Sequence, residues 1–385
     1  MLKIVPLALL FLIITNPLFA KESNFIYSIR QEYLSTRAMG MGNAYTAVVE
    51  NSEALYFNPA ALSLLQSTSP EFIFTFGQVA STVGDNFFKK LYDDISTSSK
   101  KGSSSDRTST LANLIESKYG KSYSARLHTL SALYGRKGFA MGFIPIDLTA
   151  NLFVHQQIGP TIILNAYEDS SITLGYGVKL SNALAIGVSA KSLYRIYYYK
   201  NLPAIELANN STSFHRSQAQ EGVAFDADLA LLYTLPSYPV SLGVHCKNLL
   251  DQGPKYDPNI INSNSNAGMP PKLARRVDFG MKAEFAKIWK ARLRPLLSAD
   301  IRDSFHPNWS LRKGIHLGSE LSYAHPSYPL ALALRTGLGQ LYLSYGFSLK
   351  LFWFTLEYAR YGEEVGTRGT HQQNRTDMLR VALIF

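Results

Sequence analysis

Beyond its first twenty residues, the 385-residue chain lacks any apolar run long enough to cross a membrane as a helix. Such a helix needs about twenty apolar residues, because it rises about 1.5 Å per residue through roughly 30 Å of hydrocarbon. Charged residues are also scarce, at 17% of the chain, against about 25% in ordinary soluble domains. A membrane protein with this composition must hide its apolar side chains in an alternating pattern.

Cysteine is nearly absent too, since Cys246 is the single cysteine of the sequence. One thiol forms no internal disulfide, and small exported domains usually depend on such bridges. It also provides no thiolate cluster for a metal, and the eight histidines show no His-Glu-x-x-His spacing. We therefore expect no metal and no cofactor, and a fold that depends on strand pairing instead.

Two patterns that often accompany catalysis have simpler explanations here. Gly40-x-Gly42 lacks the third glycine of a nucleotide-binding loop. Asp226 and Asp228 share one face of an extended strand, a geometry that favours lining over acid–base catalysis. No nucleophile elbow supports a hydrolase, although one built from separated serine and histidine residues stays open. We expect a protein without enzymatic activity and name no catalytic residue.

The formal net charge of +10 raises the question of nucleic-acid binding. No basic run, however, is longer than two or three residues, and many cations fall at alternate positions of candidate strands, where they would line a pore. Aromatic residues make up 12% of the chain, and tyrosine alone occurs 23 times. This composition favours a membrane protein, and we expect no nucleic acid among its partners.

The N-terminus has the order of a secretory signal peptide. Lys3 precedes an apolar run over residues 4–14, a helix break at Pro17 and the small residue Ala20. An uncleaved anchor is the alternative, but this run is too short to span a bilayer. No cysteine follows directly, which excludes a lipid-anchored lipoprotein. Residues 1–20 are therefore expected to be removed after export.

Alternation with a period of two recurs along the rest of the chain. Over residues 275–285, small or polar side chains occupy the even positions and mostly large apolar ones the odd positions. The same division recurs over 223–231 and 330–338. A period of two places the two sets on opposite sides of a sheet. A polar inward set and an apolar outward set are the reverse of a soluble barrel and indicate a lipid-facing exterior.

The predicted fold class is therefore all-β, a transmembrane antiparallel β-barrel of about fourteen strands, with an uncertainty of about two because each strand signal is weak. The candidate strands lie near 72–80, 123–134, 139–148, 171–180, 184–198, 222–234, 240–248, 275–285, 292–302, 313–323, 330–338, 341–349, 352–361 and 377–385. The connectors mostly alternate between short turns and long polar segments, as periplasmic turns and external loops do. Two places depart from this pattern, the short connector 338–341 and the turn near Lys350, which contains no glycine or proline.

The last candidate strand alternates and ends in Phe385. It resembles the C-terminal strand that the outer-membrane barrel assembly machinery recognises, so Phe385 is predicted to be an assembly signal and that machinery a partner. A buried last strand of a soluble protein is the alternative. Together with a signal peptide, the pattern favours the membrane barrel.

An alanine-rich segment lies between the signal peptide and the first candidate strand, bounded by a glycine turn and an Asn-Pro break. It is too short to fold alone, and a mere leader is the simple alternative. The residues that carry the pattern are Gly40, Gly42, Asn43, Asn58, Pro59 and Ala60. This pattern resembles the hatch of the FadL family of outer-membrane long-chain fatty acid transporters, and the resemblance implies that these residues form the plug and gate.

The resemblance implies further properties of the chain. Residues 21–68 are expected to form a plug, or hatch, inside the lumen of a barrel formed by 69–385. The protein would lie in the bacterial outer membrane, surrounded by its lipids, and would carry a hydrophobic ligand, with long-chain fatty acid the expected one. Its ligand would leave sideways into the bilayer. No ligand-contacting residue of the family is carried over to this sequence.

The same N-terminal pattern also resembles the PorV branch, whose barrels serve protein secretion or surface attachment. A strand over 242–249 that ends in an Asn-Leu turn suits that branch as well. Protein secretion or attachment is therefore the alternative function.

Pro145 lies within the third candidate strand, three residues after Gly142. Proline donates no ladder hydrogen bond and is normally confined to an edge or a bulge. The strand either is interrupted there or ends at Ile144, with Pro145 starting the loop. FadL-type barrels release their ligand through a kink in the third strand, so the resemblance favours an interruption. Gly142 and Pro145 are the predicted lateral exit.

Overall fold

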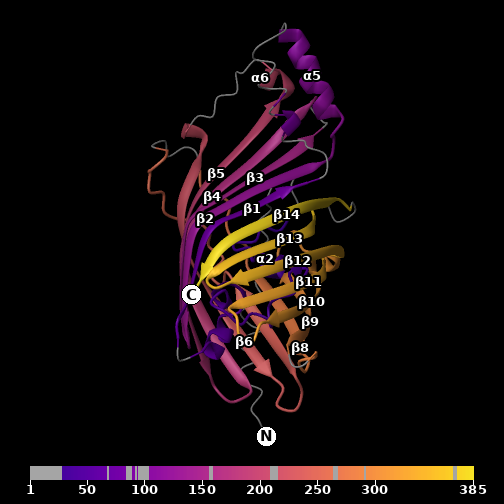
Figure 1. Cartoon of the computed structure of the whole chain (residues 1–385). Coiled ribbons are helices and arrows are strands. Elements are labelled where there is room, and N and C mark those ends of the chain that lie inside the picture. Colours follow the sequence, from indigo (N-terminus) through magenta and orange to yellow (C-terminus); the bar gives the residue numbers. More distant parts are fainter. Residues whose placement is uncertain are drawn as a thin grey trace.

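The computed structural model describes residues 28–66, 69–83, 89–91, 93, 104–155, 159–208, 216–262, 268–289, 292–366 and 371–385. The predicted signal peptide lies outside these residues. Within the described part of the chain, fourteen antiparallel strands close into one barrel, in which each strand pairs with its neighbours in sequence and β1 pairs with β14 (Figure 1). The strands are β1 Glu71–Thr82, β2 Ser122–Arg136, β3 Phe139–His155, β4 Thr161–Lys179, β5 Leu184–Pro203, β6 Gln220–Thr234, β7 Val240–Lys247, β8 Arg276–Glu284, β9 Leu293–Ser304, β10 Ile315–Ala324, β11 Leu330–Gly339, β12 Tyr342–Leu351, β13 Phe354–Glu364 and β14 Gln373–Ile384. The predicted fold class and strand count are confirmed.

The exterior of the barrel is apolar and its interior is polar. On β11, Leu334 is 65% exposed whereas its neighbour Arg335 is 7% exposed. A soluble barrel would show the opposite order, because its apolar side chains fill the interior. Among the described helices, none is both long enough and apolar enough to cross a membrane.

The two connectors that departed from the predicted alternation are tight turns. Gln340 and Leu341 join β11 to β12 with φ values of 55° and 64°, and Phe352 starts the next turn with a φ of 54°. A two-residue hairpin with positive φ at both positions matches the twist of antiparallel strands. The short connector therefore replaces an external loop without changing the strand count.

The barrel wall is uneven in height, as Figure 1 shows for β3, β4 and β5. These strands have 17, 19 and 20 residues, whereas β7 has 8. A tilted strand needs only about ten residues to cross the membrane, so the long strands project beyond it. Helices α5 (Ser104–Glu116) and α6 (Ala204–Ala208) pack on this projection, with Leu111, Ile115, Leu152, Ile162 and Leu207 in a separate apolar core.

The projection explains where the sequence misplaced two boundaries. The third strand was predicted to end at 148 and the fourth to start at 171, but β3 continues to His155 and β4 begins at Thr161. Residues 161–170 do not alternate cleanly between apolar and polar side chains. Strand residues beyond the bilayer face no lipid, so nothing imposes that alternation on them.

Residues 28–66, called the plug below, lie inside the barrel, and Figure 1 shows α2 within the ring of strands. The plug contains α2 (Thr36–Gly40), α3 (Ala54–Phe57) and the 3₁₀ helix η1 (Pro59–Leu64). Its backbone approaches the wall closely. A Cβ atom added at Gly337 of β11 would lie 2.5 Å from the carbonyl carbon of Met41, a distance shorter than Cβ atoms keep from other heavy atoms. Glycine on the wall therefore makes room for the plug.

Candidate functional site

The glycine turn of the plug packs on one side of the barrel. Gly42 has a φ of +63°, and a Cβ there would lie 2.7 Å from the carbonyl oxygen of Leu317, so this position needs glycine on two grounds. Asn43 also has a positive φ, of 65°, and both of its oxygens accept hydrogen bonds from Nη1 of Arg302, at 2.8 and 2.6 Å. Gly40 lies against Gly346 of β12.

The Asn-Pro-Ala break packs on another side. Asn58 Oδ1 accepts the N–H of Ala60 at 3.1 Å, which caps η1, and Pro59 occupies the first turn, where its missing N–H costs nothing. The amide nitrogen of Asn58 donates to the carbonyl of Thr46 at 3.1 Å and to that of Leu231 on β6 at 3.2 Å. The six predicted plug residues thus form two separate wall contacts and do not meet in one place.

A buried carboxylate that the sequence analysis did not single out connects the plug to the wall. Glu53 accepts hydrogen bonds from Tyr33 at 3.0 Å and Ser35 at 2.8 Å. It also pairs with Arg380 of β14 at 2.8 Å, and the two side chains are 2% and 3% exposed. Unlike these two, Glu50 is 30% exposed and pairs with Lys282 and Arg294 at the wall. Burial raises the pKa of Glu50, but hydrogen bonds from Arg294 and the charge of Lys282 lower it to about 2.

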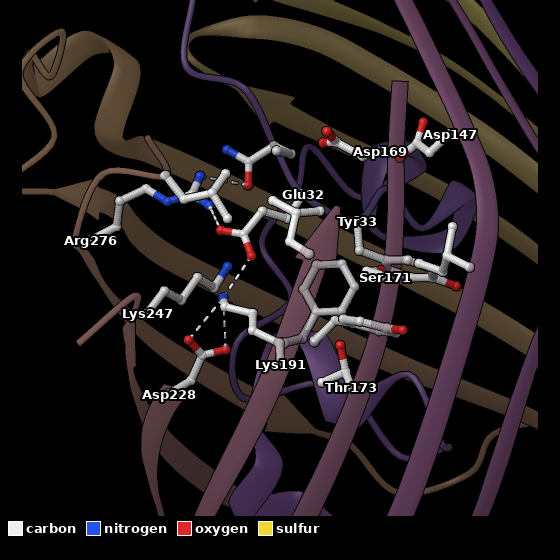
Figure 2. A pocket seen from close by; sticks show the side chains of 16 residues that line it. Glu32, Tyr33, Asp147, Asp169, Ser171, Thr173, Lys191, Asp228, Lys247 and Arg276 are labelled. Carbon is white, nitrogen blue, oxygen red and sulfur yellow. Dashed lines mark hydrogen bonds and ion pairs between the residues drawn. The ribbon is translucent and has the colours of Figure 1, made fainter. Parts of the chain in front are cut away.

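A cavity of about 40 Å³, called the luminal cavity below, lies between the plug and strands β3 to β8. Figure 2 shows Glu32 at its centre, between Arg276 and Lys191. Glu32 accepts from Lys191 at 2.6 Å and from Arg276 at 2.7 Å, and Lys191 also pairs with Asp228 at 3.0 Å. Although burial raises the pKa of Glu32, the two cations lower it to about 2, so this carboxylate is ionised at neutral pH.

The opposite side of the luminal cavity is partly aromatic. Tyr33 and Tyr56 stack there with their ring centroids 4.4 Å apart, and Phe57 and Ile144 also line the cavity, beside polar side chains of β3 and β4. The cavity is therefore amphipathic. At about 40 Å³ it has room for about three water molecules, and a long alkyl chain enters only after the plug residues rearrange.

The strand that contains Pro145 is interrupted but does not end there. Ile144 pairs with Ser171 and Asp147 with Asp169, so β3 holds one extra residue at this point, a β-bulge. The ladder from β2 to β3 skips the same place, between the pairs Thr129–Ile146 and Ala132–Phe143.

Two neighbouring strands are irregular at the same height. Leu130 of β2 has a φ of 55°, and β1 carries a bulge against β14 between Thr75 and Gly77. Extending the register of the flanking pairs places Phe76 opposite Leu130 and Leu130 opposite Pro145. We call these three residues, Phe76, Leu130 and Pro145, the seam. The sequence offered a signal only for Pro145.

Gly142 lies outside the interruption. It pairs regularly with Leu133 and Thr173, and a Cβ there would meet the side chains of Tyr56 and Leu55 in the plug. Its structural context is therefore the contact between plug and wall. Phe385 closes the ring, exchanging two main-chain hydrogen bonds with Phe72 at 3.0 and 3.3 Å.

A closed antiparallel ring with an apolar exterior, a charged interior and an internal segment that fills it is the architecture of a bacterial outer-membrane β-barrel. The deltaS2 mutant of the TodX monoaromatic hydrocarbon channel has a similar fold, with a TM-score of 0.50 and 11% identity over 92% of this chain and 98% of that one. The predicted resemblance is confirmed as a likeness of fold to this outer-membrane channel.

Two further solved structures are similar at lower scores. The toluene transporter TbuX of Ralstonia pickettii has a TM-score of 0.49 and 10% identity, covering 92% of this chain and 99% of that one. A FadL homologue of Pseudomonas aeruginosa has a TM-score of 0.45 and 8% identity, covering 93% and 99%. No protein-family model and no curated protein matches the chain.

Proposed function

We propose that this barrel carries hydrophobic small molecules across the outer membrane, with long-chain fatty acids as the expected ligands. The ligand enters from the external side, passes the luminal cavity and leaves sideways into the bilayer at the seam. One observation carries this proposal: Ile144 and Asp147, which flank the bulge at Pro145, both line the luminal cavity. An interruption of the strand pairing thus lies directly beside the space in the lumen.

The outer side of the seam suits such an exit. Phe76 and Leu130 are 47% and 53% exposed on the lipid face. An alkyl chain that moves from the lumen to this surface gains about 0.8 kcal/mol for each methylene removed from water. The similar TodX and TbuX structures are described as a monoaromatic hydrocarbon channel and a toluene transporter. These descriptions support hydrophobic cargo and leave aromatic hydrocarbons as competing ligands to compare.

Replacing Pro145 by valine is expected to reduce uptake of a labelled long-chain fatty acid by intact cells. Valine provides the missing N–H, and one restored ladder hydrogen bond stabilises the closed wall by about 1 kcal/mol, so uptake should fall by about fivefold. Pro239→Val is the matched control, because that proline lies in the turn between β6 and β7. Unchanged uptake by a correctly assembled Pro145→Val barrel would remove the seam from the route.

The projection above the membrane favours the second candidate function, protein secretion or surface attachment. Its helices α5 and α6 form their own apolar core, which a simple channel does not need. If this candidate is right, deleting residues 104–116 abolishes co-purification of secreted proteins and wild-type cells show no fatty-acid uptake. If the transporter proposal is right, the wild type takes up fatty acid and the deletion leaves that uptake intact.

A further inference from the structure

A second cavity, of about 70 Å³, lies next to the luminal cavity and shares Leu273 and Arg276 with it. We call it the outer cavity, because its wall residues on β3, β4 and β5 lie further along these strands toward the projection. Its lining contains four cationic side chains: Arg30, Arg195, Lys272 and Arg276. No carboxylate occurs among its described lining residues. The luminal cavity, in contrast, is lined by Glu32, Asp147, Asp169 and Asp228.

Carboxylates outside the lining of the outer cavity form ion pairs with its cations. Arg195 donates to both oxygens of Asp169, at 2.8 Å each, and Arg30 of the plug pairs with the same carboxylate at 2.9 Å. Arg276 pairs with Glu32 and Asp303, at 2.7 and 3.1 Å. Ion pairs on one side fix the guanidinium groups in place, which prepares them to receive a ligand on the other side.

Some donors at this place have no hydrogen-bond partner in the described part of the chain. The Nε atoms of Arg30 and Arg276 are buried and make no hydrogen bond to any described residue, and Arg276 is only 2% exposed. A buried donor of a charged group without an acceptor is unfavourable, so the positive charge at this place lacks a full set of acceptors.

Uncharged donors join the cations. Asn165 Oδ1 accepts from Tyr197 at 2.7 Å, so the remaining capacity of this side chain lies in its N–H₂ group. The Nδ1 atom of His306 accepts the N–H of Asn308 at 3.0 Å, which places the ring proton on Nε2. Burial and the nearby charge of Arg276 lower the pKa of His306 to about 4, so the neutral ring donates at neutral pH.

We propose that the outer cavity binds a tetrahedral oxyanion, a group of the phosphate type. A planar carboxylate is satisfied by a single guanidinium fork, whereas a tetrahedral group presents oxygens in several directions. Here the donors converge from five separate parts of the chain: the plug with Arg30, β5 with Arg195, the end of the β7–β8 connector with Lys272, β8 with Arg276 and the β9–β10 connector with His306.

The source of the oxyanion follows from the neighbouring cavity. Because the two cavities share Leu273 and Arg276, a head group in the outer cavity places an attached alkyl chain toward Tyr33 and Tyr56. A ligand that occupies both cavities is then an amphiphile with a phosphate head, which the barrel would bind in addition to fatty acids. This step rests on the proposed transport function, whereas the oxyanion site itself does not.

Calorimetric titration of the purified barrel tests the proposal with three probes, namely inorganic phosphate, dodecyl phosphate and dodecanol. Two partly exposed residues are changed, in Lys272→Gln and His306→Gln, because a variant of the buried Arg195 would disturb folding. Each is expected to weaken binding of dodecyl phosphate by about tenfold, since a charge-assisted hydrogen bond contributes about 1.5 kcal/mol or more. Lys137→Gln, in the exposed turn between β2 and β3, is the matched control and should bind as the wild type does.

The outcomes separate the site from the transport function. Binding of dodecyl phosphate that both variants weaken supports the proposal, and binding of inorganic phosphate alone supports a site for a free oxyanion. If neither phosphate binds, or if Lys272→Gln and Lys137→Gln bind equally well, the proposal is wrong. Dodecanol bound and transported without any phosphate binding would overturn the oxyanion site while leaving hydrophobic transport intact.

Discussion

Deletion of residues 28–66 is expected to turn a nearly closed barrel into an open pore. The deletion removes the plug from the periplasmic end of the lumen, including η1. The carbonyl oxygen of Leu62 in η1 accepts the N–H of Gly138 in the β2–β3 turn at 2.8 Å. Side chains fill the interior of an eight-stranded barrel, whereas a barrel of roughly sixteen to eighteen strands encloses an aqueous channel. A barrel of fourteen strands is therefore closed only when the plug fills its lumen.

Single-channel recording in planar bilayers measures this effect. The deleted barrel should conduct at a level approaching that of porins, and the full chain should conduct far less. Heat-resistant migration in a denaturing gel provides the control, because it reports that the strands still close. A heat-resistant deletion barrel with unchanged conductance would show that the plug does not occlude the lumen.

Loss of the charge on Glu53 is expected to release the plug. Glu53→Gln leaves Arg380 buried with a weaker set of partners, and breaking one side of a buried ion pair costs about 3–5 kcal/mol. Part of that cost is offset here, because Arg380 keeps Glu357 at 3.1 Å. We expect plug docking to weaken by about 3 kcal/mol, which corresponds to more than a hundredfold change in the population of undocked plug.

Hydrogen exchange of the main-chain amides over residues 33–58 measures this docking. Glu50→Gln is the matched control in the same segment, because its carboxylate is 30% exposed and exposed pairs contribute about 1 kcal/mol or less. Protection of the plug amides is expected to fall much more in Glu53→Gln than in Glu50→Gln. Equal protection of the plug amides in both would contradict the structural role given to Glu53.

The fourteen strands could be predicted because the membrane imposes their pattern locally. In every membrane-spanning strand, the side chains at alternate positions face lipid and must be apolar. This requirement produces a pattern that can be recognised in the sequence over about ten residues. Outside the bilayer this rule does not apply, and there the predicted strand boundary was wrong: β4 begins at Thr161 in the projection and not near 171. Alternation marks the part of each strand inside the bilayer.

The partners of the plug could not be predicted in this way. Glu53 and Arg380 are separated by 327 positions in the sequence, and nothing in the sequence around one of them indicates that the other is its partner. The seam shows the same limit on a smaller scale. Proline has a fixed backbone consequence and marks Pro145, whereas a leucine with positive φ, such as Leu130, leaves no signal in the residue type.

Photocrosslinking tests the route directly. A long-chain fatty acid that carries a diazirine in its tail is bound to the barrel in liposomes and irradiated, and the adducts are located by peptide mass spectrometry. Passage through the seam predicts adducts at Tyr56 and Ile144 inside and at Phe76 and Leu130 on the lipid face, all suppressed by excess unlabelled fatty acid. Adducts spread evenly over the exterior, and not displaced by unlabelled fatty acid, would contradict a lateral exit at this place.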